Sequence, residues 1–473
     1  MSHQNKIEPK SSDSSHDQNE TKENLNKREQ IISLLKEVLY NSLAQAIIKI
    51  FLSPFIIIKV ILFMFVLTST GLASFLVISS VMTYFTYGVS TTSRTIYETP
   101  TLFPKVTFCN FNRITTEYGF KLIQSRKIIE VDYLSVEEQK KIARDFNEIL
   151  LNCTFELKTC NSSDFVWSYD PFYGNCYTFN SGFDSNGNRI DFKKSPLSGY
   201  VAGLQLTLYV NVYENLLNTG FVNGLGALFQ IGNNSYITYY GVNGIRVAPG
   251  YSTNIAVDRE FNSIMPKPYS NCDIDSMFKL DSDLFNLISQ SKYQYTQQLC
   301  LTQCFQQYLI NHLNCTVSLI LNLFNVTRVC DNLAISLYSN SSFVSKFYSD
   351  ICLPLCPLEC SQTFYKTSLS SIFLPGDPYV NLIQNSNLSS DFIHRTINAA
   401  TAEKSIINAN IFYDSLSYKE STESPQMDIV SLLASIGGNL GLFLGVSVFS
   451  LCEIVEVIIE IYFIIGSGRS KKI

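Results

Sequence analysis

Two long apolar runs stand out from an otherwise mixed pattern of apolar and polar residues. The first covers residues 60–81 and the second covers residues 429–465. Each is long enough to cross about 30 Å of hydrocarbon as a helix. The first run begins too far along the chain for a secretory signal peptide, and it lacks a clear small-residue cleavage site. We therefore expect two membrane-spanning helices, over residues 60–86 and 426–465.

The basic residues that flank these runs predict the topology. Lysines precede the first run, whereas no Lys or Arg follows it until Arg94, and Arg469 comes directly after the second run. Because cytoplasmic flanks are enriched in Lys and Arg, we expect both chain ends in the cytoplasm. The predicted layout is a cytoplasmic tail with a pre-membrane segment over residues 1–59, an extracellular domain over 87–425 and a cytoplasmic tail over 466–473.

The pattern outside the two runs predicts a mixed α/β domain. Apolar and polar residues alternate over 204–212, which is typical of a strand, and the Gln- and Leu-rich stretch at 300–313 favours a helix. Residues 1–30 are polar, mixed in charge and poor in aromatics, so we expect a disordered tail there. A short amphipathic stretch follows, over 31–51.

Composition supports a membrane protein. Charged residues make up 16% of the chain and hydrophobic residues 46%. Soluble domains average about 25% charged residues, so part of the apolar surface is expected to face lipid. The formal net charge of -5, without a basic patch, gives no indication of nucleic-acid binding.

Cysteines and glycosylation sequons place residues 87–425 in an oxidising compartment. Twelve of the 13 cysteines lie between Cys109 and Cys360, and the last, Cys452, lies in the second run. An eighth sequon, at Asn19, falls in the expected cytoplasmic tail and should not be glycosylated. The seven outer sequons begin at Asn152, Asn161, Asn233, Asn314, Asn325, Asn340 and Asn387.

The outer segment offers little material for enzyme chemistry. It contains no Gly-rich phosphate loop and no His-Glu-x-x-His motif, and its only histidines are His312 and His394. A Ser-His catalytic site or a zinc site would need further histidines or other metal-binding side chains in a recognisable motif. We therefore expect no catalytic residues, no bound metal and no cofactor.

Three acids interrupt the second apolar run, at Glu453, Glu456 and Glu460. Their spacings of three and four put them on one face of a helix. A carboxylate near the bilayer centre costs about 2.5–3.5 kcal/mol by insertion scales, so this face should meet water, partners or cations. The alternative is that the acids snorkel at the interfacial end of a long helix.

Glycines at 437, 438, 441 and 445 lie just upstream, four within nine residues. They fit either close packing of small residues between helices or a broken span. An unwound stretch within a membrane must line a wet cavity or be buried in protein. There, carbonyls and the Ser447 hydroxyl could replace the hydration of an ion. One such helix cannot enclose a pore, so a symmetric oligomer of at least three copies follows from any channel hypothesis.

Five motifs in the same order resemble the degenerin/epithelial sodium channel family, which includes acid-sensing and neuropeptide-gated channels. The resemblance covers nearly all of the chain after about residue 40. The motifs are FPKVTFCN at 103–110, GNCYTFN at 174–180, VAPG at 247–250, PKPY at 266–269 and the pre-pore and filter block at 433–447.

The resemblance implies a trimeric, sodium-selective channel of the plasma membrane, often blocked by amiloride, with an acid-sensing-channel-like fold. Gly445, Val446 and Ser447 would match the selectivity filter. Glu453 would match the acidic position below it, with Glu456 and Glu460 as further pore-lining acids. Ala434 would match the small residue at which added bulk locks such channels open.

The resemblance also implies a disulfide pairing and shows one departure. The family's His-Gly pair before the first span is replaced by Gln45-Ala46. Because that pair influences opening, this chain is expected to gate unusually or to need sibling subunits. The implied pairs are Cys109–Cys176, Cys153–Cys160, Cys272–Cys360, Cys300–Cys356, Cys304–Cys352 and Cys315–Cys330.

The stimulus is less determined by the sequence. Dense outer carboxylates, which would titrate together near neutral pH, are lacking, and histidines are few. Short tails are most like those of the neuropeptide-gated invertebrate members, so we favour an extracellular amidated peptide as ligand of a homo- or heterotrimer. Proton gating, a constitutively open channel, calcium permeability and a non-conducting cell-surface receptor remain as alternatives.

Overall fold

The computed structural model divides the chain into two compact units, which are described separately. One joins residues 1–90 with 425–473, and the other covers residues 91–424. The described residues are 53–125, 135–170, 173–210, 224–237, 244–272, 283–291, 293–317, 341–374, 404–445 and 447–467, with single positions between 29 and 50 and between 322 and 381.

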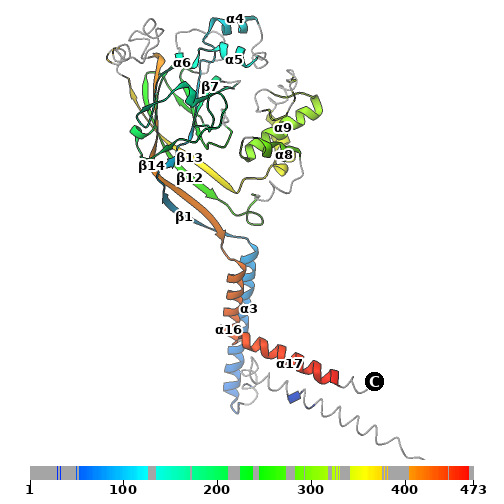
Figure 1. Ribbon diagram of the computed structural model, residues 1–473. Helices are drawn as coiled ribbons and strands as arrows, with labels where there is room; N and C mark the ends of the chain where they lie inside the picture. Colours follow the sequence, from blue (N-terminus) through cyan, green and yellow to red (C-terminus); the bar gives the residue numbers. More distant parts are fainter. Residues whose placement is uncertain are drawn as a thin grey trace, which may run out of the picture. The chain divides into compact units, whose positions relative to one another are not determined.

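The larger unit is built on a seven-stranded sheet with the order β13-β12-β14-β9-β4-β5, in which β1 also pairs with β14 (Figure 1). β12 and β13 run antiparallel along their whole length, whereas β12 and β14 are parallel. The strands are β1 (Val89–Tyr97), β4 (Leu150–Phe155), β5 (Lys158–Thr159), β9 (Leu204–Tyr209), β12 (Tyr251–Ser263), β13 (Ser361–Phe373) and β14 (Ile406–Pro425).

A five-stranded sheet with the order β11-β10-β3-β7-β6 completes the core. Apolar side chains from the two sheets, including Phe108, Phe229 and Ile411, form one buried cluster. β3 and β7 are buried at every position, as expected of central strands. The strands are β3 (Lys105–Asn110), β6 (Phe165–Asp170), β7 (Gly174–Phe179), β10 (Ala227–Gly232) and β11 (Ile245–Val247), beside a small pair of β2 (Thr101–Leu102) and β8 (Lys194–Ser195).

Among the helices that the structure describes in this unit, the longest is α9 (Gln297–Leu313), which contains the helix predicted at 300–313. Thr296 caps its start by accepting a hydrogen bond from the Leu299 N–H, and it ends at Asn314 in the left-handed conformation. The others are α4 (Glu117–Ser125), α5 (Val136–Ile142), α6 (Phe146–Ile149), α8 (Asp283–Gln290), α11 (Ser341–Phe347) and α12 (Leu353–Leu355), with single turns η2 (Ser162–Asp164), η3 (Tyr200–Ala202) and η5 (Tyr348–Cys352).

Six disulfides staple the larger unit, and they join the same pairs that the family resemblance implies. Two of them fix α9 to the segment around η5 and form part of a second buried cluster. Cys452 is a free thiol on an exposed position of the smaller unit. The pairs are Cys109–Cys176, Cys153–Cys160, Cys272–Cys360, Cys300–Cys356, Cys304–Cys352 and Cys315–Cys330.

In its described part, the smaller unit contains α3 (Ile56–Phe85), α16 (Ile429–Leu444) and α17 (Val448–Ser467). Within the described part of the chain, α3 is the one helix long and apolar enough to cross a membrane, with a mean hydropathy of 2.3. It corresponds to the predicted first span but begins four residues earlier than expected, at Ile56. The second predicted span is divided into α16 and α17, because the helix stops at Leu444.

Candidate ion pathway

The break between α16 and α17 falls at the Gly-x-Ser motif. Gly445 adopts a φ of 71°, and its N–H bonds back to the carbonyl oxygens of Gly441 and Leu440. This left-handed conformation is costly for residues with a Cβ and favours glycine. Val446 lies outside the described residues, and Ser447 is exposed. Of the two interpretations of the glycines, the structure therefore contains the broken helix.

Small residues form one exposed face of α16. Ala434, Gly437, Gly438 and Gly441 are all exposed, at spacings that place them on one side of the helix. A Cβ built on Gly437 or Gly438 would meet no described atom of the chain within 4 Å. A single copy therefore leaves room for a second helix or for water along this face.

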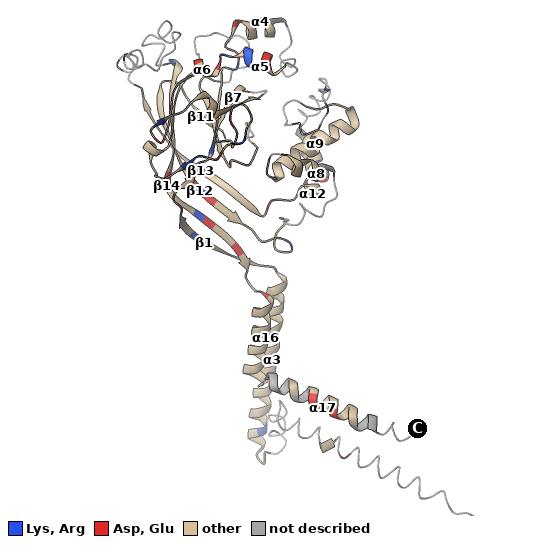
Figure 2. Ribbon diagram, viewed as in Figure 1, with Lys and Arg blue, Asp and Glu red and all other residues tan. Residues whose placement is uncertain are grey.

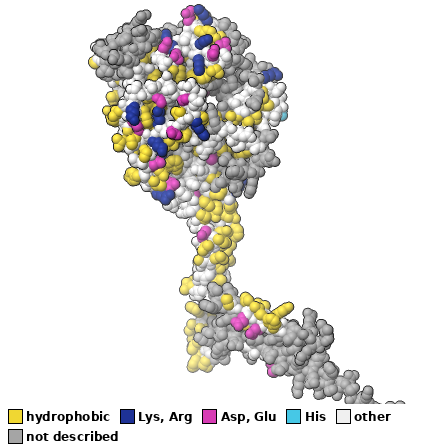
Figure 3. All heavy atoms as spheres, in the orientation of Figure 1, with side chains coloured by type: hydrophobic (Ala, Val, Ile, Leu, Met, Phe, Trp, Pro, Cys, Tyr) yellow, Lys and Arg dark blue, Asp and Glu magenta, His cyan; other side chains and the backbone are white. Residues whose placement is uncertain are grey.

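Acidic side chains lie beyond the break, on α17 (Figure 2). Glu456 and Glu460 are both exposed, and their spacing of four places them on the same side of the helix. Ile458 and Tyr462 are exposed as well, and their spacing from the two acids places them on the opposite side of α17. Figure 3 shows acidic and apolar side chains exposed on this helix. Glu453 belongs to the same helix, but its side chain lies outside the described residues.

The predicted glycosylation sites and the predicted gating pair lie partly within and partly outside the described residues. Asn161 and Asn314 are exposed, whereas Asn152 and Asn233 are half-buried. The predicted gating pair Gln45-Ala46 lies outside the described residues, as do Asn19, Asn325, Asn340 and Asn387.

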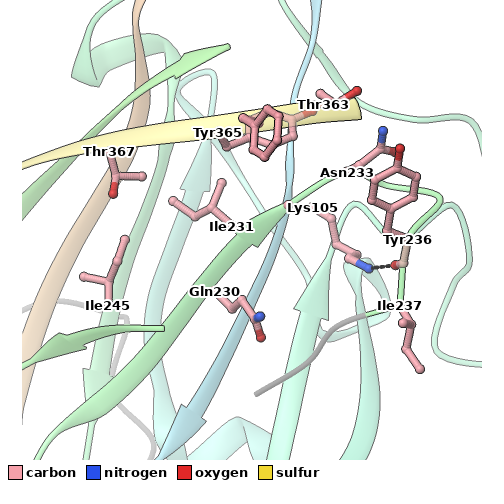
Figure 4. A pocket seen from close by; sticks show the side chains of 12 residues that line it. Lys105, Gln230, Ile231, Asn233, Tyr236, Ile237, Ile245, Thr363, Tyr365 and Thr367 are labelled. Atoms are coloured by element: carbon pink, nitrogen blue, oxygen red, sulfur yellow. Dashed lines mark hydrogen bonds between the residues drawn. The ribbon is translucent and has the colours of Figure 1, made fainter. Parts of the chain in front are cut away.

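The larger unit contains a cavity of about 500 Å³ between β10 and β13 that sequence reasoning missed (Figure 4). Lys105 is almost fully buried there, and its ammonium group donates a hydrogen bond to the Tyr236 carbonyl oxygen. The signal in the sequence was a lysine inside a strand whose other positions read as core. The lining residues are Lys105, Gln230, Ile231, Gly232, Asn233, Tyr236, Ile237, Ile245, Thr363, Phe364, Tyr365 and Thr367.

The described lining of this cavity combines polar and apolar side chains and includes no acidic one. It combines one ammonium group with threonine and tyrosine hydroxyls and with two side-chain amides. Burial, followed by the nearby Glu359 carboxylate, raises the pKa of the Tyr236 phenol. Such a lining suits a ligand that offers carbonyl or amide groups and disfavours one that offers a second cation.

A pair of carboxylates in the larger unit, Asp258 and Asp414, was also missed. They belong to the neighbouring strands β12 and β14, where the register of the pairing shifts. Partial burial and then the Asp414 carboxylate raise the pKa of Asp258, and Lys366 opposes this shift. Among the described residues, no group of three His, Cys, Asp or Glu side chains is placed to hold a metal ion.

Comparisons with known proteins point to channel subunits. A family model described as "Amiloride-sensitive sodium channel" matches residues 38–143 and 121–457. Acid-sensing ion channel 1C of Danio rerio is 24% identical over 446 residues, which are 85% of this chain and 79% of the relative. Epithelial sodium channel subunit beta of Neoceratodus forsteri is 27% identical over 341 residues, which are 70% and 49%.

Subunit alpha of the epithelial sodium channel of Mus musculus is 30% identical over 319 residues, which are 66% of this chain and 43% of the relative. The chain thus spans about half the length of the epithelial sodium channel subunits that it matches.

Proposed function

Because the chain belongs to the amiloride-sensitive sodium channel family, we propose that it is a subunit of a sodium-selective cation channel in the plasma membrane. Proteins of this family are channels and not enzymes. Three copies of this chain, or this chain with sibling subunits, enclose the pore. The break of the second apolar segment at Gly445, with acids beyond it, is the observation that carries the proposal.

The proposed layout keeps the predicted domain bounds. Residues 60–86 and 426–465 cross the membrane, 87–425 lie outside, and 1–59 and 466–473 are cytoplasmic. The apolar surface of α3 and the six disulfides of the larger unit support this division, because disulfides persist in oxidising compartments.

In this layout the carbonyl groups and hydroxyl of Gly445, Val446 and Ser447 replace part of the hydration shell of permeating Na⁺. The carboxylates of Glu453, Glu456 and Glu460 raise the local concentration of cations beyond the filter. Ala434, with Gln45 and Ala46 on the N-terminal side of the first span, acts in opening. The exposure of Ala434, Glu456 and Glu460 in a single copy supports these roles.

We further propose that an extracellular amidated peptide opens the channel. The cavity between β10 and β13 supports this stimulus, because its hydroxyl and amide groups can bond a terminal carboxamide. The Lys105 ammonium in the lining would repel the amino end of a peptide, so the amide end is the part expected to enter.

Recording from cells that express the chain tests the channel proposal. We expect sodium-selective currents that are lost or changed in selectivity by Gly445→Ala, because alanine resists the left-handed conformation. Gly71→Ala is the matched control: Gly71 lies within α3, and a Cβ there also meets no described atom within 4 Å. A non-conducting receptor would bind its ligand equally well in both variants and carry no current.

Perfusing a panel of amidated peptides and acid steps tests the stimulus. We expect a peptide to open the channel and Thr367→Val, which removes one hydroxyl from the cavity, to raise the concentration needed. Opening of the homomer by acid, with no response to any peptide, would contradict this part of the proposal and leave the channel itself intact.

A further inference from the structure

The hydroxyl side chains of α3 make two kinds of hydrogen bond. Thr68, Thr70 and Thr83 donate to carbonyl oxygens of α3 itself, four residues earlier. Ser69 donates instead to the neighbouring helix, from its Oγ to the carbonyl oxygen of Phe443 at 2.5 Å. A serine within a helix commonly bonds its own preceding turn. This bond therefore ties α3 to one particular point of α16.

That point is the end of the helix. Phe443 lies two residues before Gly445, in the last turn of α16. The last four carbonyl groups of a helix have no partner within it. The Gly445 N–H donates hydrogen bonds to the carbonyl oxygens of Gly441 and Leu440. The Ser69 hydroxyl donates a hydrogen bond to the carbonyl oxygen of Phe443. Without such a partner, a carbonyl group within hydrocarbon is strongly unfavourable.

Within the described part of the chain, the bend at Gly445 has open space beside it. A Cβ built on Gly445 would meet no described atom within 4 Å. Glycine also gives the backbone more freedom than any other residue. The direction in which the chain leaves α16, and thus the direction of the carbonyl groups that follow, needs a restraint from outside the bend. The Ser69 hydroxyl supplies one, from a helix of thirty residues.

We infer that Ser69 is a positioning residue for ion selection: its hydroxyl holds the end of α16 and thereby fixes the point, at Gly445, from which the proposed filter begins. Ser69 does not itself touch the ion. The inference rests on the proposed channel function and assigns to the first span a part in selectivity.

The same helix pair offers a matched control. Ser80, eleven residues further along α3, shares a hydrogen bond of 2.9 Å with Ser435 of α16. At 1.5 Å per residue this contact lies about 16 Å along the helix from Ser69. Both serines join the same two helices, but only Ser69 bonds a carbonyl group at the end of α16.

The experiment measures the ratio of sodium to potassium permeability from reversal potentials, which do not depend on the number of channels at the surface. We expect Ser69→Ala to lower the ratio several-fold, because the end of α16 loses one of its restraints, and Ser80→Ala to leave the ratio unchanged. Threonine and valine have nearly the same shape, but only threonine carries a hydroxyl. The Ser69→Thr channel should therefore keep the wild-type permeability ratio, and the Ser69→Val channel should have a lower one.

Equal ratios for the Ser69→Ala and Ser80→Ala channels, or for the Thr and Val variants, would overturn the inference. The Thr and Val pair decides the matter even where Ser69→Ala fails to reach the surface. A wild-type chain that carries no current, alone or with sibling subunits, would instead count against the proposed function.

Discussion

Arg259 shows how the larger unit holds a buried charge. Its side chain is 4% exposed, and its guanidinium bonds the Glu98 carboxylate at 2.8 Å. The rings of Phe261, Tyr413 and Tyr418 lie 5.1–5.7 Å from the same group. The charge is thus paired on one side and faces aromatic rings on the others, an arrangement that offsets the cost of burial.

Replacing this arginine should destabilise the protein strongly. We expect Arg259→Met to lower the free energy of unfolding by about 2 kcal/mol, because the bond to Glu98 and the contacts of the buried guanidinium with aromatic rings are lost, while the Glu98 carboxylate, 46% exposed, can be hydrated. The matched control is Arg94→Met: Arg94 pairs with Glu420 at 2.5 Å but is 67% exposed. Exposed pairs contribute about 0–1 kcal/mol. Thermal unfolding of the purified protein measures both, and equal losses would contradict the interpretation.

The carboxylate pair Asp258 and Asp414 predicts a dependence of stability on pH. The pKa of Asp258 is raised in the folded protein, so folding favours its protonated form. Ionisation of Asp258 therefore reduces stability at neutral pH, and this penalty disappears as the pH falls through the raised pKa. Asp258→Asn should raise the unfolding temperature at neutral pH and give no advantage once Asp258 is protonated.

Asp184 is a control for which stability is expected to change with pH in the opposite direction. Hydrogen bonds from the side chain and backbone of Asn188 lower its pKa, so its stabilising effect is present at neutral pH and is lost on acidification. Asp184→Asn should lower the unfolding temperature at neutral pH or leave it unchanged. A gain from Asp258→Asn that stays the same at every pH would show that packing, and not charge, is the cause.

At the scale of elements, local patterns were predicted well and non-local contacts were not. Alternation at 204–212 predicted β9, and the Gln- and Leu-rich stretch predicted α9, because both patterns act within a few residues. The parallel pairing of β12 with β14 and the cavity between β10 and β13 depend on segments far apart in the chain. The pattern of residues within one segment does not predict which distant segment it will contact.

The break at Gly445 could not be chosen from the sequence for a different reason. Glycine favours both close helix packing and a left-handed turn. The same sequence is therefore compatible with a continuous, closely packed helix and with a broken one. The hydrogen bonds at the end of α16 separate them in the structure.

The disulfides differ in how much chain they constrain. Cys272–Cys360 closes a separation of 88 residues and Cys153–Cys160 one of 7. In the chain-entropy account, the longer loop contributes about 2 kcal/mol more to stability. Replacing both cysteines of the first pair by alanine should therefore lower the unfolding temperature more than the same change in the second pair. Equal losses would indicate that local packing decides the contribution.

At the scale of the molecule, the apolar surface needs partners. Ile429, Val430, Leu433 and Leu442 of α16 are 54–78% exposed in one copy (Figure 3). A membrane covers such groups with lipid, but the adjacent face of glycines fits close contact with a helix of another copy. A trimer in a bilayer accounts for both kinds of surface, and this is why the proposed subunit is incomplete as a single chain.

The glycosylation pattern tests the proposed layout of the whole chain. Asn161 follows the Cys153–Cys160 hairpin and Asn314 follows α9, and both are exposed. If residues 87–425 lie outside the cell, Asn161→Gln and Asn314→Gln should each remove one glycan, seen as a gel shift that a glycosidase abolishes. Asn19→Gln should change nothing, because the proposed layout places the N-terminal tail in the cytoplasm. A glycan at Asn19 would place the N-terminus outside and reverse the first span.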